Sequence, residues 1–148
     1  MKSYKEFINE SNEIDRDELN SIIDPIRDDI LDMLVDFVGY DIKFIPVNML
    51  DSSVVFKLQI IRKGYPLSGY ELIDPILVDV DILDELGRVC NFIKSEIGFV
   101  YTHSNYFVNY FVNNYPSRFM MSVDDIFKSV GKKVTDISMF FEKSVSLY

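Results

Sequence analysis

The sequence predicts an α+β fold in a single domain, with a mostly antiparallel sheet and about three helices in the order α-β-β-(β)-α-β-β-α. Two observations carry this prediction. Apolar residues recur at helical spacing within residues 26–38 and 82–97. Residues 53–63 instead alternate between two faces, as a half-buried strand does. Because strands and helices come in blocks joined by short turns, we expect hairpins rather than a parallel sheet.

The first predicted helix starts at Asp24-Pro25. Asp24 suits the N-cap, and Pro25 suits the first helical position, where its missing N–H costs nothing. A turn or helix over residues 14–23 can lead into it. Gly39 is expected to end the helix as its C′ residue. The apolar positions at helical spacing are Ile26, Ile30, Met33, Leu34, Phe37 and Val38.

A hairpin follows over residues 41–47 and 53–63, joined by a turn at 48–52. Residues 70–73 can add a third short strand. The second helix is marked by an apolar stripe that Gly98 ends. The stripe consists of Ile82, Leu83, Leu86, Val89, Cys90, Ile93 and Ile97. The tetrapeptide Ile-Asp-Pro-Ile at 23–26 recurs at 73–76. We interpret the two copies as similar helix starts rather than as a duplication.

The C-terminal third predicts strands and one more helix. Residues 99–103 read as a strand. Residues 105–114, a tandem of Asn-Tyr-Phe-Val, fit a strand better than a helix because Tyr, Phe and Val favour strands. Ser122 is a suitable N-cap for a helix over 123–130. Residues 135–145 form a last helix or strand, with Ile137, Phe140 and Phe141 buried.

Composition limits the classes of function. A hydrophobic content of 48% in 148 residues supports a proper core. The net charge is -9, and residues 1–50 carry 12 acids against 5 bases, so direct nucleic-acid binding is not expected. No apolar run is long enough to span a membrane. The single cysteine excludes an internal disulfide.

Residues for catalysis are sparse, so we predict no metal and no cofactor, and the sequence favours a protein that is not an enzyme without deciding the question. His103 is the only histidine, and Cys90 lies on an apolar helical stripe, which favours a core role over a Cys–His site. Asp79, Asp81, Asp84 and Glu85 could suggest a metal site. Acids in a first turn also favour a helix N-terminus electrostatically, and we prefer that interpretation.

Four aspartates could form a partner-binding face. Asp24, Asp28, Asp32 and Asp36 recur every four residues, which places them about 6 Å apart along one helix ridge. Such spacing is close to that of phosphates in nucleic acid. The ridge is thus either a face that mimics DNA and occupies a host protein, or simply a solvated acidic surface.

Residues 1–11, MKSYKEFINES, combine a basic and aromatic start with an Ile-x-Glu sequence followed by a small residue. This segment resembles the capsid-targeting sequence of internal head proteins in T-even-type bacteriophages. The resemblance implies packaging into the head. It also implies that a prohead protease recognises a site at Ile8, Glu10 and Ser11 and cuts after Glu10. It would divide the chain into a removable segment, 1–10, and an acidic domain, 11–148.

The leading hypothesis is therefore a phage head-associated protein, made in the host cytoplasm, that binds a host or virion protein without catalysis. One alternative is a small acidic cytoplasmic binding module, similar in element order to the dimeric class I type III secretion chaperones. A DNA mimic that inhibits a host defence protein is another. An enzyme that works through carboxylates such as Asp79, Asp81 and Glu85 is the least favoured.

Overall fold

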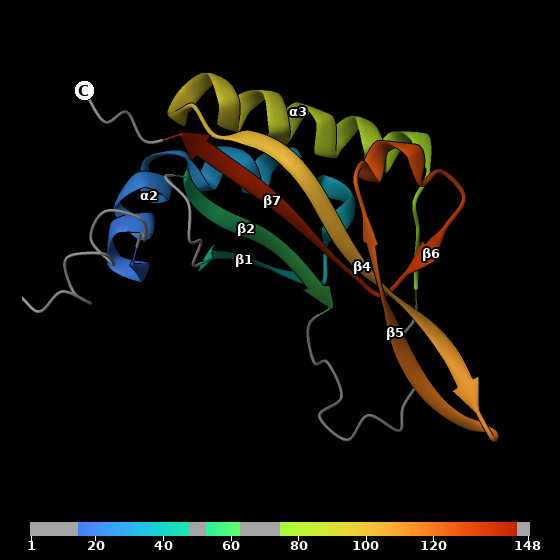
Figure 1. The fold of residues 1–148 in the computed structure, drawn as a ribbon. Helices are drawn as coiled ribbons and strands as arrows, with labels where there is room; N and C mark the ends of the chain where they lie inside the picture. The colour runs from blue at the N-terminus through green and yellow to red at the C-terminus, as the bar shows by residue number, and fades with distance from the viewer. Residues whose placement is uncertain (1–14, 48–52, 63–74, 145–148) are drawn as a thin grey trace, which may run out of the picture.

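The computed structural model describes residues 15–47, 53–62 and 75–144. Its five-stranded antiparallel sheet has the order β1-β2-β7-β4-β5, and β3 pairs with β6 in a separate two-stranded sheet. Two α-helices lie against one face of the larger sheet (Figure 1). The elements are α2 (Arg16–Met33), η1 (Val35–Phe37), β1 (Tyr40–Val47), β2 (Ser53–Arg62), β3 (Ile76–Leu77), α3 (Val80–Ile97), β4 (Val100–Val112), β5 (Tyr115–Val123), η2 (Ile126–Lys128), β6 (Lys133–Val134) and β7 (Asp136–Ser144).

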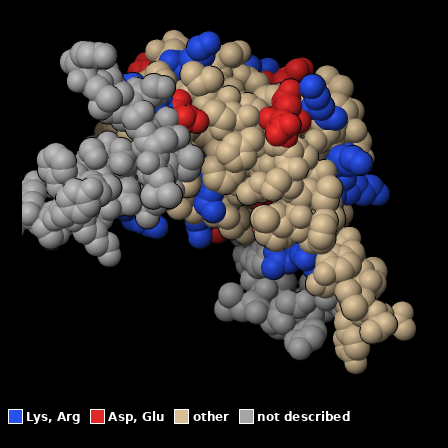
Figure 2. Space-filling view, viewed as in Figure 1, with Lys and Arg blue, Asp and Glu red and all other residues tan. Residues whose placement is uncertain are grey.

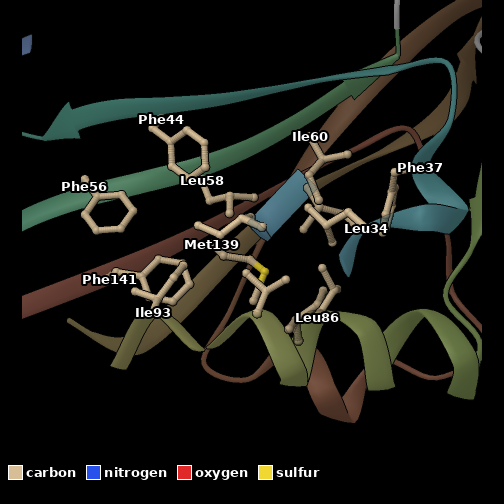
Figure 3. Packing of buried hydrophobic residues seen from close by; sticks show 14 of the residues in the cluster. Leu34, Phe37, Phe44, Phe56, Leu58, Ile60, Leu86, Ile93, Met139 and Phe141 are labelled. Carbon is tan, nitrogen blue, oxygen red and sulfur yellow. The ribbon is translucent and has the colours of Figure 1, made fainter. Parts of the chain in front are cut away.

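The core lies between the two helices and the sheet. Alternate residues of the strands point toward the helices, as the two-residue period of a strand requires. Phe56 is fully buried and stacks on Phe141 with ring centroids 5.2 Å apart. Figure 3 shows side chains of α3 meeting those of the central strands. The labelled residues of this contact are Leu58, Leu86, Ile93, Met139 and Phe141.

The predicted start of the first helix at Asp24 is wrong. The helix begins at Arg16, and Asp15 is its N-cap, with a carboxylate that accepts a hydrogen bond from the Glu18 N–H at 2.7 Å. Pro25 lies inside the helix. A proline there costs about 3 kcal/mol. Complete burial of Leu19 and Ile23 in the turns before it contributes roughly 1.5–3 kcal/mol each, which offsets that cost.

The end of this helix also differs from the prediction. α2 ends at Met33, and the short 3-10 helix η1 separates it from Gly39. Gly39 has a φ of +87°, so it still supplies the left-handed residue, but for the turn into β1. Val38, expected to be buried, is exposed. The helical spacing of the apolar residues therefore predicted a buried stripe that extends further toward Val38 than it does in the structure.

Several predictions are confirmed. β1 and β2 form the antiparallel hairpin, with Tyr40 opposite Arg62 and Val47 opposite Val55. α3 carries the second apolar stripe and ends at Gly98, which has a φ of +76°. The tandem repeat is a strand, as predicted, but the two strands expected over 99–103 and 105–114 are one continuous strand, β4. The turn at 48–52 and the short strand at 70–73 lie outside the described residues.

Two helix predictions in the C-terminal half are wrong. Ser122 lies in β5, and a 3-10 helix of three residues replaces the helix expected over 123–130. Its cap is Asp125, and the Tyr101 hydroxyl accepts a further hydrogen bond from the Ile126 N–H at 2.9 Å. Pro75 precedes β3 rather than a helix, because α3 begins five residues later with Asp79 as its N-cap.

The last element is a strand, so the described order ends in β rather than in α. β7 lies in the middle of the sheet and pairs with β2 on one side and β4 on the other. Ile137 and Phe141 are buried as expected, whereas Phe140 faces the opposite side of the sheet and is only half-buried. The described residues thus contain two α-helices, where about three were predicted for the chain.

Candidate functional site

The exposed side of α2 is strongly acidic toward its C-terminal end. Asp24, Asp28 and Asp32 are exposed and follow one ridge of the helix, with Asp29 beside them. The last turn holds no basic residue. The C-terminus of a helix carries a partial negative charge, and Asp32 in the last turn lies where the helix dipole disfavours a carboxylate. This arrangement costs stability rather than adding to it.

One carboxylate of the ridge is neutralised within the chain. Arg27 donates to Asp24 at 3.2 Å and to the Asn20 side chain at 3.4 Å, and its guanidinium also lies over the Phe44 ring. In the described part of the chain, no basic side chain pairs with Asp28, Asp29 or Asp32. The unbalanced negative charge is therefore concentrated in the last two turns of α2.

The fourth predicted member, Asp36, does not continue the ridge. It lies in η1, after the helix has ended. Its backbone N–H donates to a carboxylate oxygen of Glu85 in α3 at 3.2 Å. The structure therefore brings three of the four predicted residues onto one helix ridge. The four-residue period failed at Asp36 because the chain leaves the α-helix at Leu34.

Glu85 is a buried carboxylate that ties α3 to η1. Only 3% of the residue is exposed, and its second carboxylate oxygen has no hydrogen-bond partner among the described residues. Burial raises the pKa of Glu85, and the hydrogen bond from the Asp36 N–H opposes this shift. Glu85 thus takes the place of a capping side chain for η1, which has none of its own.

An open groove of about 410 Å³ adjoins the acidic end of α2. Most of its lining is apolar, and Leu31, Val35 and Val38 are exposed there. Asp32 belongs to both the ridge and the groove. The complete lining is Leu31, Asp32, Leu34, Val35, Phe37, Val38, Gly39, Tyr40 and Ile42. We call this region, together with Asp28 and Asp29, the acidic groove. It combines apolar surface with unbalanced negative charge.

Cys90 and His103 are not brought together. Cys90 lies on α3 and packs against the core, where burial and the charge of Asp125 raise its pKa to about 12. His103 lies on the opposite face of the sheet, where its ring stacks on Phe140 at 4.3 Å. A thiol with so high a pKa is a poor nucleophile at neutral pH.

The acids at the start of α3 have separate structural roles. Asp79 is the N-cap and accepts from the Ile82 N–H at 2.8 Å. Asp81 lies in the first turn and Asp84 is exposed, whereas Glu85 is buried. Within the described residues, no three acidic, histidine or cysteine side chains lie close enough to hold a metal ion.

Sequence reasoning missed the groove, because its lining comes from α2, η1 and β1 and depends on where the helix ends. The available signal in the sequence was Val35, an apolar residue next to the acidic helix end that does not fit the predicted apolar stripe. Ile8, Glu10 and Ser11 lie outside the described residues. None of the described helices is long and apolar enough to cross a membrane. Comparison with protein-family models, curated proteins and solved structures gives no match.

Proposed function

We propose that this chain is a bacteriophage head-associated protein, packaged inside the head and delivered with the DNA, that acts by binding a host or virion protein rather than by catalysis. The resemblance of residues 1–11 to capsid-targeting segments supports the location. The observation that carries the binding role is the acidic groove, where carboxylates with no basic partner among the described residues border exposed apolar side chains at one end of α2.

The occupant that fits the acidic groove is a protein segment with an apolar anchor and flanking lysine or arginine residues. The anchor would cover Val35 and Val38, which are exposed in the described chain. The cations would lie beside Asp28 and Asp32 and the negative end of the helix dipole. Binding would therefore relieve the electrostatic cost of the free protein, and it should weaken as salt screens the charges.

A DNA mimic is the second candidate. The ridge of Asp24, Asp28 and Asp32 keeps the spacing that suggested it, and these side chains are exposed. The groove favours the first candidate, because exposed valines beside the carboxylates do not contribute to the mimicry of phosphates. Competition separates the two. Double-stranded DNA should displace the target of a mimic, because both occupy one site, and should leave an apolar-anchored partner in place.

The location is tested by mass spectrometry of purified virions. We expect the protein in the particles, with Ser11 as its first residue and the preceding ten residues removed. Absence of the protein from particles would refute the head-associated role. Presence with an intact N-terminus would leave packaging standing but refute cleavage at Glu10.

The binding site is tested by affinity capture from host lysate. The baits are the wild-type chain and the Asp28→Asn/Asp32→Asn and Val35→Ser variants. We expect each variant to lose most of the captured partner, because each removes one element of the groove. The matched control is Asp17→Asn, an exposed acid in the first turn of the same helix, which should capture normally. Equal capture by all four baits would contradict the assignment of the site.

A further inference from the structure

The β4–β5 hairpin extends well beyond the rest of the sheet. β4 pairs with β7 only as far as Phe107 opposite Asp136, whereas its pairing with β5 continues to Val112 opposite Tyr115. Residues 108–119 therefore form a two-stranded projection, which we call the arm (Figure 1). Asn113 and Asn114, both at positive φ, form its turn.

One face of the arm continues the core-facing side of the sheet. Tyr106 is buried in the core and Val108 packs against it, and alternate residues beyond them share their face. The two helices do not extend over this part of the hairpin (Figure 1). The result is an exposed apolar face, which consists of Tyr110, Val112, Tyr115, Phe119 and Met121. The Tyr110 and Phe119 rings meet edge to face at 6.1 Å.

The size of this face fits a protein interface. From their exposed fractions, the five side chains present roughly 500 Å² of apolar surface. A standard interface buries about 800 Å² on each partner, including the surrounding polar rim. Two such faces packed together would bury about 1,000 Å² before any polar rim is counted, which is near the lower limit for a specific interface.

The charges of the chain point to the occupant. Residues 105–123 contain one charged side chain, Arg118, in a protein of net charge -9. Arg118 is on the other face of the arm, 3.8 Å from the buried Asp136 carboxylate. Figure 2 shows no acidic or basic atoms at the end of the arm. A charged partner would find no side chain of opposite charge on this face. An identical arm brings an equally uncharged face, so no charge is buried when the two meet.

We infer that the arm is a self-association surface, and that a second copy of this chain covers its apolar face through a two-fold contact. Because the arm projects away from the acidic α2, two chains can bring their arms into contact without bringing their α2 helices together (Figure 1). The acidic groove would remain open in such a dimer. This inference goes beyond the proposed function and does not depend on it.

The test is the mass of the full chain in solution, measured by light scattering during size-exclusion chromatography from about 5 to 200 µM, a range that brackets weak dimers. We expect a mass of twice the 17.3 kDa chain at the upper end. The Tyr115→Ser/Phe119→Ser variant should lose the dimer over the whole range. Circular dichroism should show it folded, because both side chains are exposed, by 66% and 52%.

The matched control is Phe111→Ser/Met120→Ser, which removes two side chains of similar exposure, 61% and 49%, from the opposite face of the same hairpin. We expect this control to remain dimeric. A wild-type chain that is monomeric at every concentration would overturn the inference. Equal loss of the dimer in both variants would also overturn it, because association would then not depend on the apolar face. The single Tyr115→Ser variant serves the same comparison if the double variant fails to fold.

Discussion

Replacement of Asp32 by lysine should stabilise the folded protein. Asp32 is exposed in the last turn of α2, where its charge opposes the helix dipole. It also lies four residues after Asp28, and like charges at that spacing repel. Asp32→Lys would place a cation at the negative helix end and would turn the repulsion into an attraction.

The expected gain is about 1 kcal/mol in the free energy of unfolding. Each charge near a helix end contributes roughly 0.3–1 kcal/mol at low salt, and each pair at four-residue spacing contributes about 0.3–0.5 kcal/mol. Exposure places both contributions near the lower end of their ranges. For a chain of this length, a gain of this size corresponds to an increase of about 3 °C in the melting temperature.

Urea denaturation followed by circular dichroism, at low salt and at 1 M NaCl, checks this prediction. The gain should fall by more than half at high salt, where the Debye length is about 3 Å. The matched control is Asp17→Lys, in the first turn of the same helix, which should destabilise by about 0.5 kcal/mol because the dipole has the opposite sign there. A gain for both variants, or a gain for Asp32→Lys that salt does not change, would refute the electrostatic account of α2.

Three further predictions concern other parts of the fold. The raised pKa of Glu85 means that the folded state holds this proton more tightly than the unfolded chain, so stability should fall as pH rises from below about 4.5 through the raised pKa. Glu85→Gln should therefore lose less stability than wild type between pH 4 and 7 in the same urea assay. Asn114→Val should destabilise the hairpin by about 1–2 kcal/mol, seen as faster amide exchange in the arm, because φ is +69° there, whereas Asn114→Gly should not. Cys90, with a pKa of about 12, should resist a thiol reagent at pH 8 until the protein is unfolded.

The elements with strong local patterns could be predicted from the sequence. The alternation within β2 and the apolar stripe of α3 each determine one face that must be buried, so their structures follow from local spacing. The role of Gly98 as the end of α3 could also be predicted, because a regular helix commonly ends at a residue with left-handed backbone. In these segments the local preference and the tertiary packing agree.

The incorrect predictions arose where tertiary contacts override local signals. Pro25 resembles a first helical residue, yet the burial of Leu19 and Ile23 extends the helix upstream of it. Ser122 resembles an N-cap, yet its strand is paired along β4. The hydroxyl of Tyr101 that fixes η2 is 25 residues away in the sequence, so no local pattern could identify it.

The candidate site was predictable only in its charge. Helical spacing places Asp24, Asp28 and Asp32 on one ridge, and the structure agrees. The position of Asp36 depends on a hydrogen bond to Glu85, which is 49 residues away. The groove requires η1 and β1 to lie against the end of α2, which is a consequence of the hairpin and helix packing together.

The two proposed surfaces should be separable by salt, because they depend on different forces. Screening weakens attraction between the acidic groove and a basic segment, so that binding should decline as salt rises. The arm carries no charge on its apolar face, and salt reduces the repulsion between two chains of net charge -9. Self-association should therefore hold or strengthen under the same conditions. If both interactions responded to salt in the same direction, one surface would have been assigned to the wrong kind of partner.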